Sequence, residues 1–356
     1  MTDRRRTRRD FLRDGAVAAA GVAASVAAGE AAAKLASAAE AAKAKTRSYN
    51  PAMEYRRLGK TGLWVSAVCL GGHWKRINKV VGKGGQAFDK NRRDVVSRCL
   101  AAGINYVDAC VGSEVMAYAK ALKGRRDQMY FGYSWYEREP RQKEWRTTEK
   151  LIEGLDAGLK ASGLEYVDVW RVTMHERGSR HSDAEVEQMV AAIAKAKQQG
   201  KARAVGFSSH DRKWIKKVIE KHPEVEVVCT PYTAASKELP QDSLFEAVRK
   251  CDVGIFGIKP FASNSLFKGD GSPDSPEAAA DDRRARLALR YILGNPAITA
   301  PIPGLISIQQ VENAVQAIKE RRVLGRAERA ELKQATDEMW ANLPEGYQWL
   351  KEWENV

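Results

Sequence analysis

Eight side chains able to carry chemistry stand where short apolar runs of the sequence end. They are His73, Asp108, Cys110, Tyr133, Thr173, His175, Ser208 and His210. Asp108 ends the run over residues 103–107, and a helical pattern opens soon afterwards at Ser113-Glu114. Imidazole, carboxylate and hydroxyl groups can move protons or orient a polar substrate. The sequence therefore predicts a polar site built from strand ends, with Asp108 as its anchor.

An alternation of strands and helices would position these groups. A hairpin is predicted about the turn Gly59-Lys60-Thr61-Gly62. Strands are then predicted at residues 66–70, 105–108, 128–134, 166–173, 202–207, 225–229, 253–258 and 298–302. Helices are predicted at residues 94–102, 113–122, 147–162, 184–198, 214–221, 243–250, 284–293 and 308–318, with a further helix at about 326–340. Residues 75–90, rich in Gly and Lys, are predicted as a loop.

Such alternation implies parallel pairing with right-handed crossovers, and eight units close naturally into a barrel. An open doubly wound sheet would need a Gly-rich phosphate loop after its first strand, and Gly71-Gly72-His73 does not match it. The fold class predicted is α/β, a (β/α)₈ TIM barrel with an N-terminal hairpin and an extra C-terminal helix. Chemistry in this fold lies at the C-terminal ends of the strands.

Composition limits the classes of partner. The 356 residues are 44% hydrophobic and 29% charged, with a net charge of +14. Residues 1–50 hold ten basic and five acidic residues, so much of the excess lies outside them. No basic helix is interleaved with aromatic residues, so no nucleic-acid partner is predicted. Five widely spaced cysteines without a Cys-x-x-Cys pair argue against a zinc ribbon, a thioredoxin-type motif and a full disulfide framework.

The first residues have the pattern of an export signal. Thr7-Arg8-Arg9-Asp10-Phe11-Leu12 precedes a small, mildly apolar run over residues 16–28, which is too short for a stable membrane span. The paired arginines followed by Phe-Leu resemble a twin-arginine signal, which implies export of a folded protein by the twin-arginine machinery. We expect a periplasmic or other extracytoplasmic location. The domains predicted are a signal at 1–33, an Ala/Lys-rich linker at 34–52 and the barrel at 53–356.

Several motifs in order make the sequence similar to the aldo-keto reductases. They are residues 55–66, 103–108, 166–170 and 201–209, Pro231-Tyr232, Ile302-Pro303-Gly304 and Gln310-Val311-Glu312-Asn313. The resemblance implies a barrel with a floor hairpin and a nicotinamide cofactor, NAD(P)(H), across its top face. It also implies a tetrad in which a tyrosine gives a proton, a lysine held by an aspartate lowers the pKa of that tyrosine, and a histidine orients the carbonyl.

Only the aspartate of that tetrad is matched, by Asp108. Val111, Ser134 and Thr173 stand where the resemblance places the tyrosine, lysine and histidine, so the resemblance is to a divergent member with an incomplete tetrad. For the cofactor, the resemblance points to Ser208 and Ser209 at the carboxamide, with Gly304 and Gln310 further along. Cys229, Ile258 and the apolar Leu305-Ile306 replace a glutamine, an aromatic residue and a basic residue.

We predict an oxidoreductase acting on a small carbonyl or sugar-like substrate, with Asp108, Tyr133 and His175 as catalytic candidates. Tyr133 would need a strand bulge to face the site. One alternative is an enzyme with other acid/base or metal chemistry at His73, Asp108, His175 and His210, although the spacing gives no metal-ligand signature. Another is a non-catalytic barrel that binds a ligand or partner.

Two smaller expectations concern single residues. Asp108 could instead cap the helix that begins near Ser113. The tryptophans of the C-terminal tail, Trp340, Trp349 and Trp353, could cover the pocket or pack on the barrel wall, and we expect the second.

Overall fold

The computed structural model describes residues 36–236, 243–320 and 322–351. The described part of the chain divides into two units at residues 46 and 47. In the first unit, residues 36–44 are helical. The signal predicted at residues 1–33 lies outside the described residues, and the predicted linker, residues 34–52, spans the division between the units.

The second unit is built on eight parallel strands in chain order: β3 (Leu70–Gly71), β4 (Tyr106–Ala109), β5 (Tyr130–Tyr133), β6 (Val167–Thr173), β7 (Ala202–Ser208), β8 (Val227–Pro231), β9 (Gly254–Ile258) and β10 (Ala300–Ile302). The backbone amides of Cys69 and Gly71 donate to the carbonyls of Pro301 and Pro303, at 3.1 and 2.7 Å, and so join the first strand to the last. The predicted (β/α)₈ barrel is confirmed.

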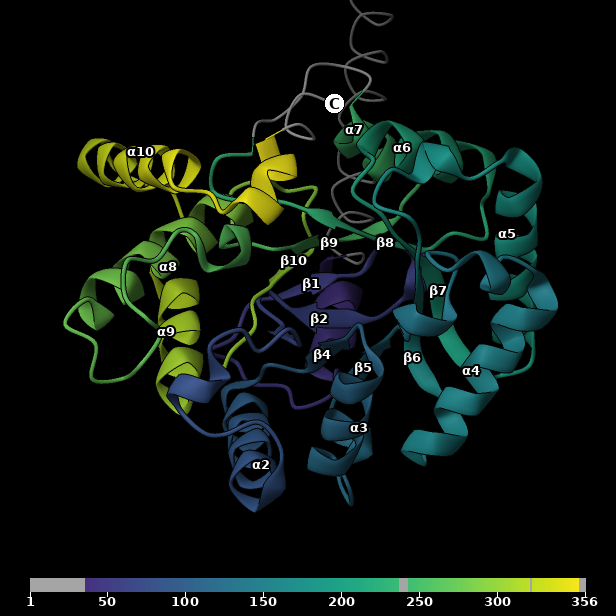
Figure 1. Ribbon diagram of the computed structural model, residues 1–356, viewed down its shortest axis with the longest axis horizontal. Helices are drawn as coiled ribbons and strands as arrows, with labels where there is room; N and C mark the ends of the chain where they lie inside the picture. Colours follow the sequence, from purple (N-terminus) through teal and green to yellow (C-terminus); the bar gives the residue numbers. More distant parts are fainter. Residues whose placement is uncertain (1–35, 237–242, 321, 352–356) are drawn as a thin grey trace, which may run out of the picture. The chain divides into compact units, whose positions relative to one another are not determined.

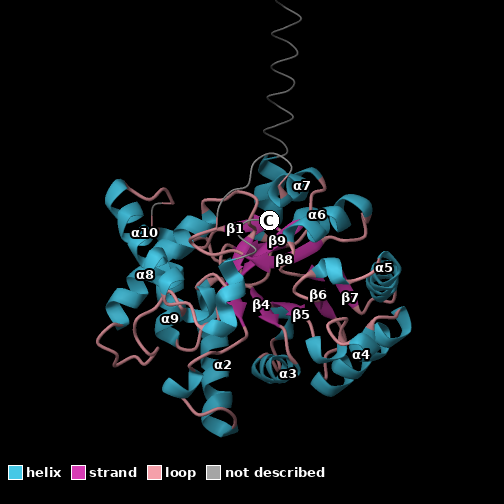
Figure 2. Cartoon of the chain, turned by 45° about the horizontal axis from the view of Figure 1, so that its top comes forward, coloured by secondary structure: helices cyan, strands magenta, loops and turns pink. Residues whose placement is uncertain are grey.

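Helices surround these strands (Figures 1 and 2). They are α2 (Gly85–Ala102), α3 (Gly112–Ala121), α4 (Thr148–Ser162), α5 (Asp183–Gln198), α6 (Arg212–Lys221), α7 (Leu244–Lys250), α8 (Ala278–Leu293), α9 (Ile308–Lys319) and α10 (Arg326–Ala341). Side chains of Thr147, Ser182, Asp211, Ser243 and Ser307 cap α4, α5, α6, α7 and α9 by accepting from backbone amides. No helix in the described ranges is both long and apolar enough to span a membrane.

Helix α2 begins inside the stretch predicted as a loop. Its first two turns bury only Phe88 and Arg92. Because only one apolar residue of these two turns faces the barrel, the sequence shows no helical repeat of apolar residues before Asp94. The predicted start of the helix, Asp94, is therefore nine residues too late.

The N-terminal hairpin closes one end of the barrel. Strands β1 (Tyr55–Arg57) and β2 (Trp64–Ser66) pair antiparallel. Between them, Leu58 is fully buried in the interior cluster that also holds Tyr106, Val227 and Phe256. The amide of Lys60 donates to Asp252 O at 2.7 Å, just before β9 begins. The hairpin therefore covers the N-terminal ends of the strands, as predicted.

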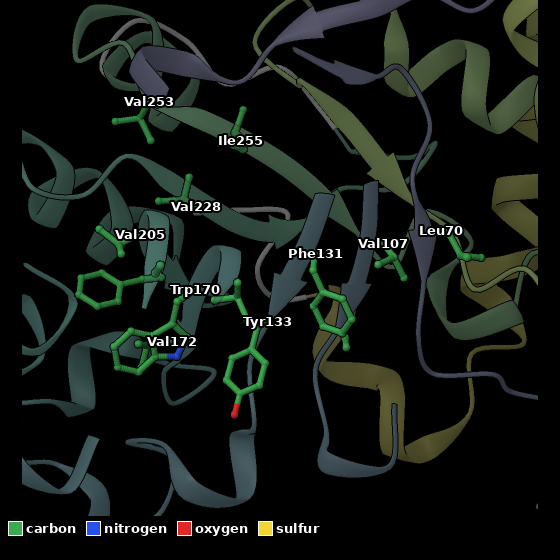
Figure 3. Close-up of a cluster of buried hydrophobic side chains, with 14 of the residues drawn as sticks. Leu70, Val107, Phe131, Tyr133, Trp170, Val172, Val205, Val228, Val253 and Ile255 are labelled. Atoms are coloured by element: carbon green, nitrogen blue, oxygen red, sulfur yellow. The ribbon is translucent and has the colours of Figure 1, made fainter. Parts of the chain in front are cut away.

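Each strand divides its side chains between two layers. Val107 of β4, Phe131 and Tyr133 of β5 and Trp170 of β6 belong to the outer, helix-facing core (Figure 3). Their neighbours point into the barrel because successive residues of a strand face opposite sides. This alternation decides which predicted site residues can reach the barrel mouth.

A buried carboxylate stabilises the N-terminal end of the barrel, which lies opposite the barrel mouth. Asp168, near the start of β6 and fully buried, forms ion pairs with Arg47 at 2.9 Å, Arg126 at 2.8 Å and Arg203 at 3.0 Å. It also accepts from the amide of Phe131 at 2.9 Å. Asp168 is thus a structural residue that joins β5, β6 and β7 to the segment preceding the hairpin.

Candidate active site

A cavity of about 470 Å³ lies at the C-terminal ends of the strands. Its walls come from the ends of β3, β4, β6, β7, β9 and β10 and from the loops that follow them. This is the end at which the fold was expected to carry its chemistry. Six of the eight polar side chains picked out from the sequence line it: His73, Asp108, Cys110, Thr173, Ser208 and His210.

Tyr133, a catalytic candidate, does not line the cavity. The strand pairs in unbroken register with Ala109 on one side and Trp170 on the other, so no bulge turns the Tyr133 ring inward. The ring packs in the outer core (Figure 3). Its buried hydroxyl lies against Gly158 of α4 and has no hydrogen-bond partner among the residues that the structure describes. Burial raises the pKa of Tyr133 far above the ordinary value. Its position does not support a role as proton donor to a ligand in the cavity.

His175, the second candidate, also lies outside the cavity wall. Strand β6 ends at Thr173, and the loop that follows turns the imidazole toward itself. Nδ1 of His175 accepts from the amide of Arg177 at 3.1 Å, and Nε2 lies 3.0 Å from Nη1 of Arg180. Both ring nitrogens are therefore used within the loop.

Asp108, the third candidate, does line the cavity, but it is paired. Nε of Arg171 donates to Oδ1 of Asp108 at 2.6 Å, and Nη2 of Arg171 donates to Oδ2. Asp108 is 4% exposed and Arg171 is 2% exposed. Burial opposes the charge of Arg171, but the charge and hydrogen bonds of Asp108, together with the nearby Cys229 and Cys110, outweigh burial and raise the pKa of the guanidinium.

Sequence reasoning missed Arg171, although the sequence held a signal for it. In β6 the residues 169, 171 and 173 face the barrel interior, and an arginine in that series needs a buried anion. The helix-cap alternative for Asp108 is wrong: α3 has Val111 at its N-cap, with no side-chain cap bond.

A second carboxylate, Glu114 of α3, binds the loop after β3. It accepts from the backbone amide and Nδ1 of His73, the latter at 2.6 Å, and from the amide of Cys110 at 2.8 Å. Burial alone would raise the pKa of Glu114, but these hydrogen bonds and His73 outweigh burial and lower it. Burial raises the pKa of the Cys110 thiol, so Cys110 is not an activated thiolate.

A hydroxyl chain occupies the ends of β5 and β6. Oγ of Ser134 lies 2.7 Å from Oγ1 of Thr173 and donates to the buried carboxylate of Glu139. Glu139 also accepts from the amide of Thr173 at 2.7 Å and from Nε1 of Trp170 at 3.1 Å. These contacts fix the wall of the cavity where Thr173 faces it.

The C-terminal segment forms part of the cavity wall. Tyr347 and Trp349, in the short helix η8 (Glu345–Lys351), both line the cavity. The ring of Trp349 stacks on His210 at 4.5 Å and 2°, and Nζ of Lys75 donates to the Tyr347 hydroxyl. For Trp349 the structure therefore favours the alternative, a tail that covers the pocket, over the expected packing on the barrel wall. Trp353 lies outside the described residues.

The loop after β9 supplies the remaining wall. Lys259, Ala262, Ser263 and Asn264 all adopt left-handed backbone conformations, with φ of 56°, 46°, 59° and 73°. The ammonium of Lys259 lies 5.6 Å from the ring centroid of Trp349. Burial, together with the charges of Arg141 and Lys75, lowers the pKa of Lys259 to about 8.

A narrower groove of about 80 Å³ adjoins the cavity between the β9 loop, α8 and the start of α9. Lys75, Phe261, Asn264 and Gly304 line both spaces, so the two are continuous. The part of the groove away from the cavity is lined by Asp281, Asp282, Leu305, Ile306, Gln310 and Asn313.

The four cofactor candidates lie in four different places. Ser208 lines the cavity, and Gly304 lies where cavity and groove meet. Gln310 lines the groove, but its Oε1 already accepts from the amide of Ile306 at 3.0 Å. The hydroxyl of Ser209 donates to carbonyls of the β6 loop, His175 O at 3.2 Å and Glu176 O at 3.1 Å, and does not reach the cavity. Within the described ranges, no group of three or more His, Cys, Asp or Glu side chains is arranged to hold a metal ion.

Comparisons with known proteins agree with this fold. L-galactose dehydrogenase of Arabidopsis thaliana is 26% identical over 308 residues, which cover 77% of this chain and 90% of that protein. L-glyceraldehyde 3-phosphate reductase of Escherichia coli K12 is 23% identical, covering 75% of this chain and 88% of that protein.

Two solved structures share the fold. The holo form of aldo-keto reductase AKR11C1 from Bacillus halodurans superimposes with a TM-score of 0.61 at 23% identity, covering 80% of this chain and 96% of that one. An aldo/keto reductase from Klebsiella pneumoniae, in complex with NADP and acetate, gives 0.58 at 17% identity, covering 78% and 94%. Residues 77–285 match the model of the Aldo/keto reductase family. By this match over more than half of its length, the chain belongs to the aldo/keto reductase family.

Proposed function

We propose that the protein is an oxidoreductase that acts on a small carbonyl or sugar-like substrate with NAD(P)(H). The observation that carries the proposal is the continuity of the cavity with the groove past Gly304. A cavity joined to a narrower groove suits a small substrate beside a dinucleotide. Two relatives named above act, by their names, on a sugar and on a sugar phosphate.

The residues along this path fit such a cofactor in part. Ser208 offers a hydroxyl to a carboxamide, and Gly304 lines both the cavity and the groove. Cys229, in contrast, is fully buried inside the barrel, and Ile258 offers an aliphatic face in place of an aromatic ring. When bound, a nicotinamide cofactor supplies or accepts the hydride.

The far part of the groove favours the unphosphorylated dinucleotide. Asp282 lies there, and its carboxylate accepts from Nε2 of Gln309 at 3.2 Å across α8 and α9. A carboxylate can accept from a ribose hydroxyl, whereas it repels a phosphate ester. We therefore propose NAD(H) ahead of NADP(H).

A proton must move as a carbonyl is reduced, and we propose Tyr347 as the group that moves it. Tyr347 faces the cavity and accepts a hydrogen bond from Lys75. Burial tends to raise the pKa of Tyr347, but the hydrogen bond and charge of Lys75, with Ser263, outweigh burial and lower it. A tyrosine tuned by a lysine is suited to general acid catalysis. Asp108 then acts as a positioning residue that holds the Arg171 guanidinium in the wall.

The test is turnover of small aldehydes and sugars with NADH and NADPH, followed by the absorbance of the reduced nicotinamide. Tyr347→Phe is expected to lower kcat by about 10²–10⁴-fold, the usual contribution of a general acid, with little change in KM. Tyr136→Phe is the matched control, because Tyr136 also lines the cavity. A Tyr347→Phe enzyme as fast as the control would remove Tyr347 from the reaction.

Native mass spectrometry of the exported protein tests the wider proposal. A mass increment equal to NAD(H) or NADP(H) would support it. A bare polypeptide mass together with no turnover would favour the alternative of a non-catalytic, ligand-binding barrel.

We also propose that the protein is exported by the twin-arginine machinery to an extracytoplasmic site. No free pool of reduced nicotinamide is expected there. An active enzyme would therefore need a tightly held cofactor, loaded before export.

A further inference from the structure

We propose that the substrate carries a carboxylate or phosphate group and that Lys259 binds this anion, with Lys75 beside it. The inference rests on the proposed function for the reaction, and it adds the substrate class. Its support is the arrangement of charges in the cavity, which can be tested by binding alone.

The carboxylates that line the cavity already have partners. Asp108 pairs with Arg171, Glu176 pairs with Arg141 at 2.9 Å, and Glu114 binds His73. Two lysines of the wall, Lys75 and Lys259, have no carboxylate within 4.0 Å among the residues that the structure describes. The cavity therefore carries positive charge that its own acids do not balance.

The two lysines lie against the same short helix. Nζ of Lys75 is 3.9 Å from the ring centroid of Tyr347, and Nζ of Lys259 is 5.6 Å from that of Trp349. Tyr347 and Trp349 are two residues apart in η8. Both ammonium groups therefore lie next to the same short aromatic segment, in the wall of the cavity. Aromatic faces attract a cation without neutralising it, so the charges stay available to a ligand.

The surroundings of Lys259 make an anion the fitting ligand. Five different loops each supply one residue near Lys259: Lys75, Cys110, Arg141, Glu176 and His210. Glu176 is the one carboxylate in this set, and it is paired with Arg141. Burial removes Lys259 from water, which is unfavourable for an unpaired charge. A bound carboxylate or phosphate restores a partner through a charge-assisted hydrogen bond.

Calorimetry on pairs that differ only in charge tests the inference. The probes are D-glucuronate against D-glucose, and glyceraldehyde 3-phosphate against glyceraldehyde. The anionic member of a pair is expected to bind about tenfold to a hundredfold more tightly, as for a hydrogen bond to a charged group. Lys259→Met should abolish the difference, whereas the control Lys90→Met, an exposed lysine of α2, should leave it unchanged.

The pH profile separates a binding role from a structural one. Anion affinity should fall as the pH rises through about 8, where Lys259 loses its proton. Lys259→Arg should bind the anion and flatten that decline, since arginine stays charged.

Three outcomes would overturn the inference. In the first, the neutral member of each pair binds as tightly as the anion, or no anion shows saturable binding. In the second, Lys259→Met binds the anions normally. In the third, ADP-ribose displaces the anion and loses the same factor in Lys259→Met, which would assign the lysine to a nucleotide pyrophosphate. Selective anion binding without turnover would leave the inference standing and count against the proposed function.

Discussion

The Asp108–Arg171 pair links β4 to β6 across the intervening β5, with both partners almost fully buried. Replacing one partner of such a pair leaves an uncompensated charge away from water. Asp108→Ala should therefore lower the free energy of unfolding by about 3–5 kcal/mol, measured by chemical denaturation.

The double variant Asp108→Ala/Arg171→Met is the control, because it removes both charges. It should recover most of the lost stability. An Asp108→Ala protein within about 1 kcal/mol of the wild type would mean that the pair does not stabilise the barrel.

At this scale, sequence reasoning reached some site residues and missed others for a physical reason. Asp108, Ser208 and His210 end strands and face inward, so their place at the barrel mouth could be predicted. Tyr133 is one position out of phase with the interior, and only a bulge could have changed that. Arg171 became a site residue through its contact with Asp108 on another strand, and its place in the inward-facing series of β6 is the sequence signal that was missed.

At the scale of elements, the loop between β6 and α5 is held by two histidines and should respond to pH. Nε2 of His181 accepts from the amide of His175 at 3.0 Å, so His181 must be neutral there. Burial and the charge of Arg146 lower the pKa of His181 from 6.5 to about 4. The unfolded chain therefore takes up this proton first, and stability should fall as the pH drops from about 6.5 toward 4.

The loss of stability from this one group is at most about 3.5 kcal/mol, because lowering a pKa by one corresponds to about 1.4 kcal/mol. Thermal unfolding across that pH range measures it, with His181→Gln as the comparison. If the variant and the wild type lose stability equally between these pH values, His181 is not the source of the pH dependence.

Elements with strong apolar periods were predicted closely, whereas those fixed by distant contacts were not. The amphipathic α4, with Leu151, Leu155 and Leu159 buried, was found within a residue at its start. The polar first turns of α2 and the position of η8 over the cavity depend on packing against other parts of the barrel, so no local pattern indicated them.

At the scale of the whole molecule, the proposed export depends on Arg8 and Arg9. The double variant Arg8→Lys/Arg9→Lys should leave the protein in the cytoplasm, because lysine keeps the charge but not the paired-arginine motif. Cell fractionation with immunoblotting measures the distribution. Arg5→Lys/Arg6→Lys is the matched control and should be exported normally. Equal export of both variants would contradict the twin-arginine proposal.

The left-handed loop after β9 has a consequence for the energy of ligand binding. A left-handed conformation at a residue other than glycine costs about 1–2 kcal/mol, and Lys259, Ala262 and Ser263 each adopt one. Packing of the rest of the barrel offsets this strain energy when the chain folds, before any ligand binds. A ligand at this wall then loses little further affinity to ordering it, so the strained loop makes the cavity preorganised.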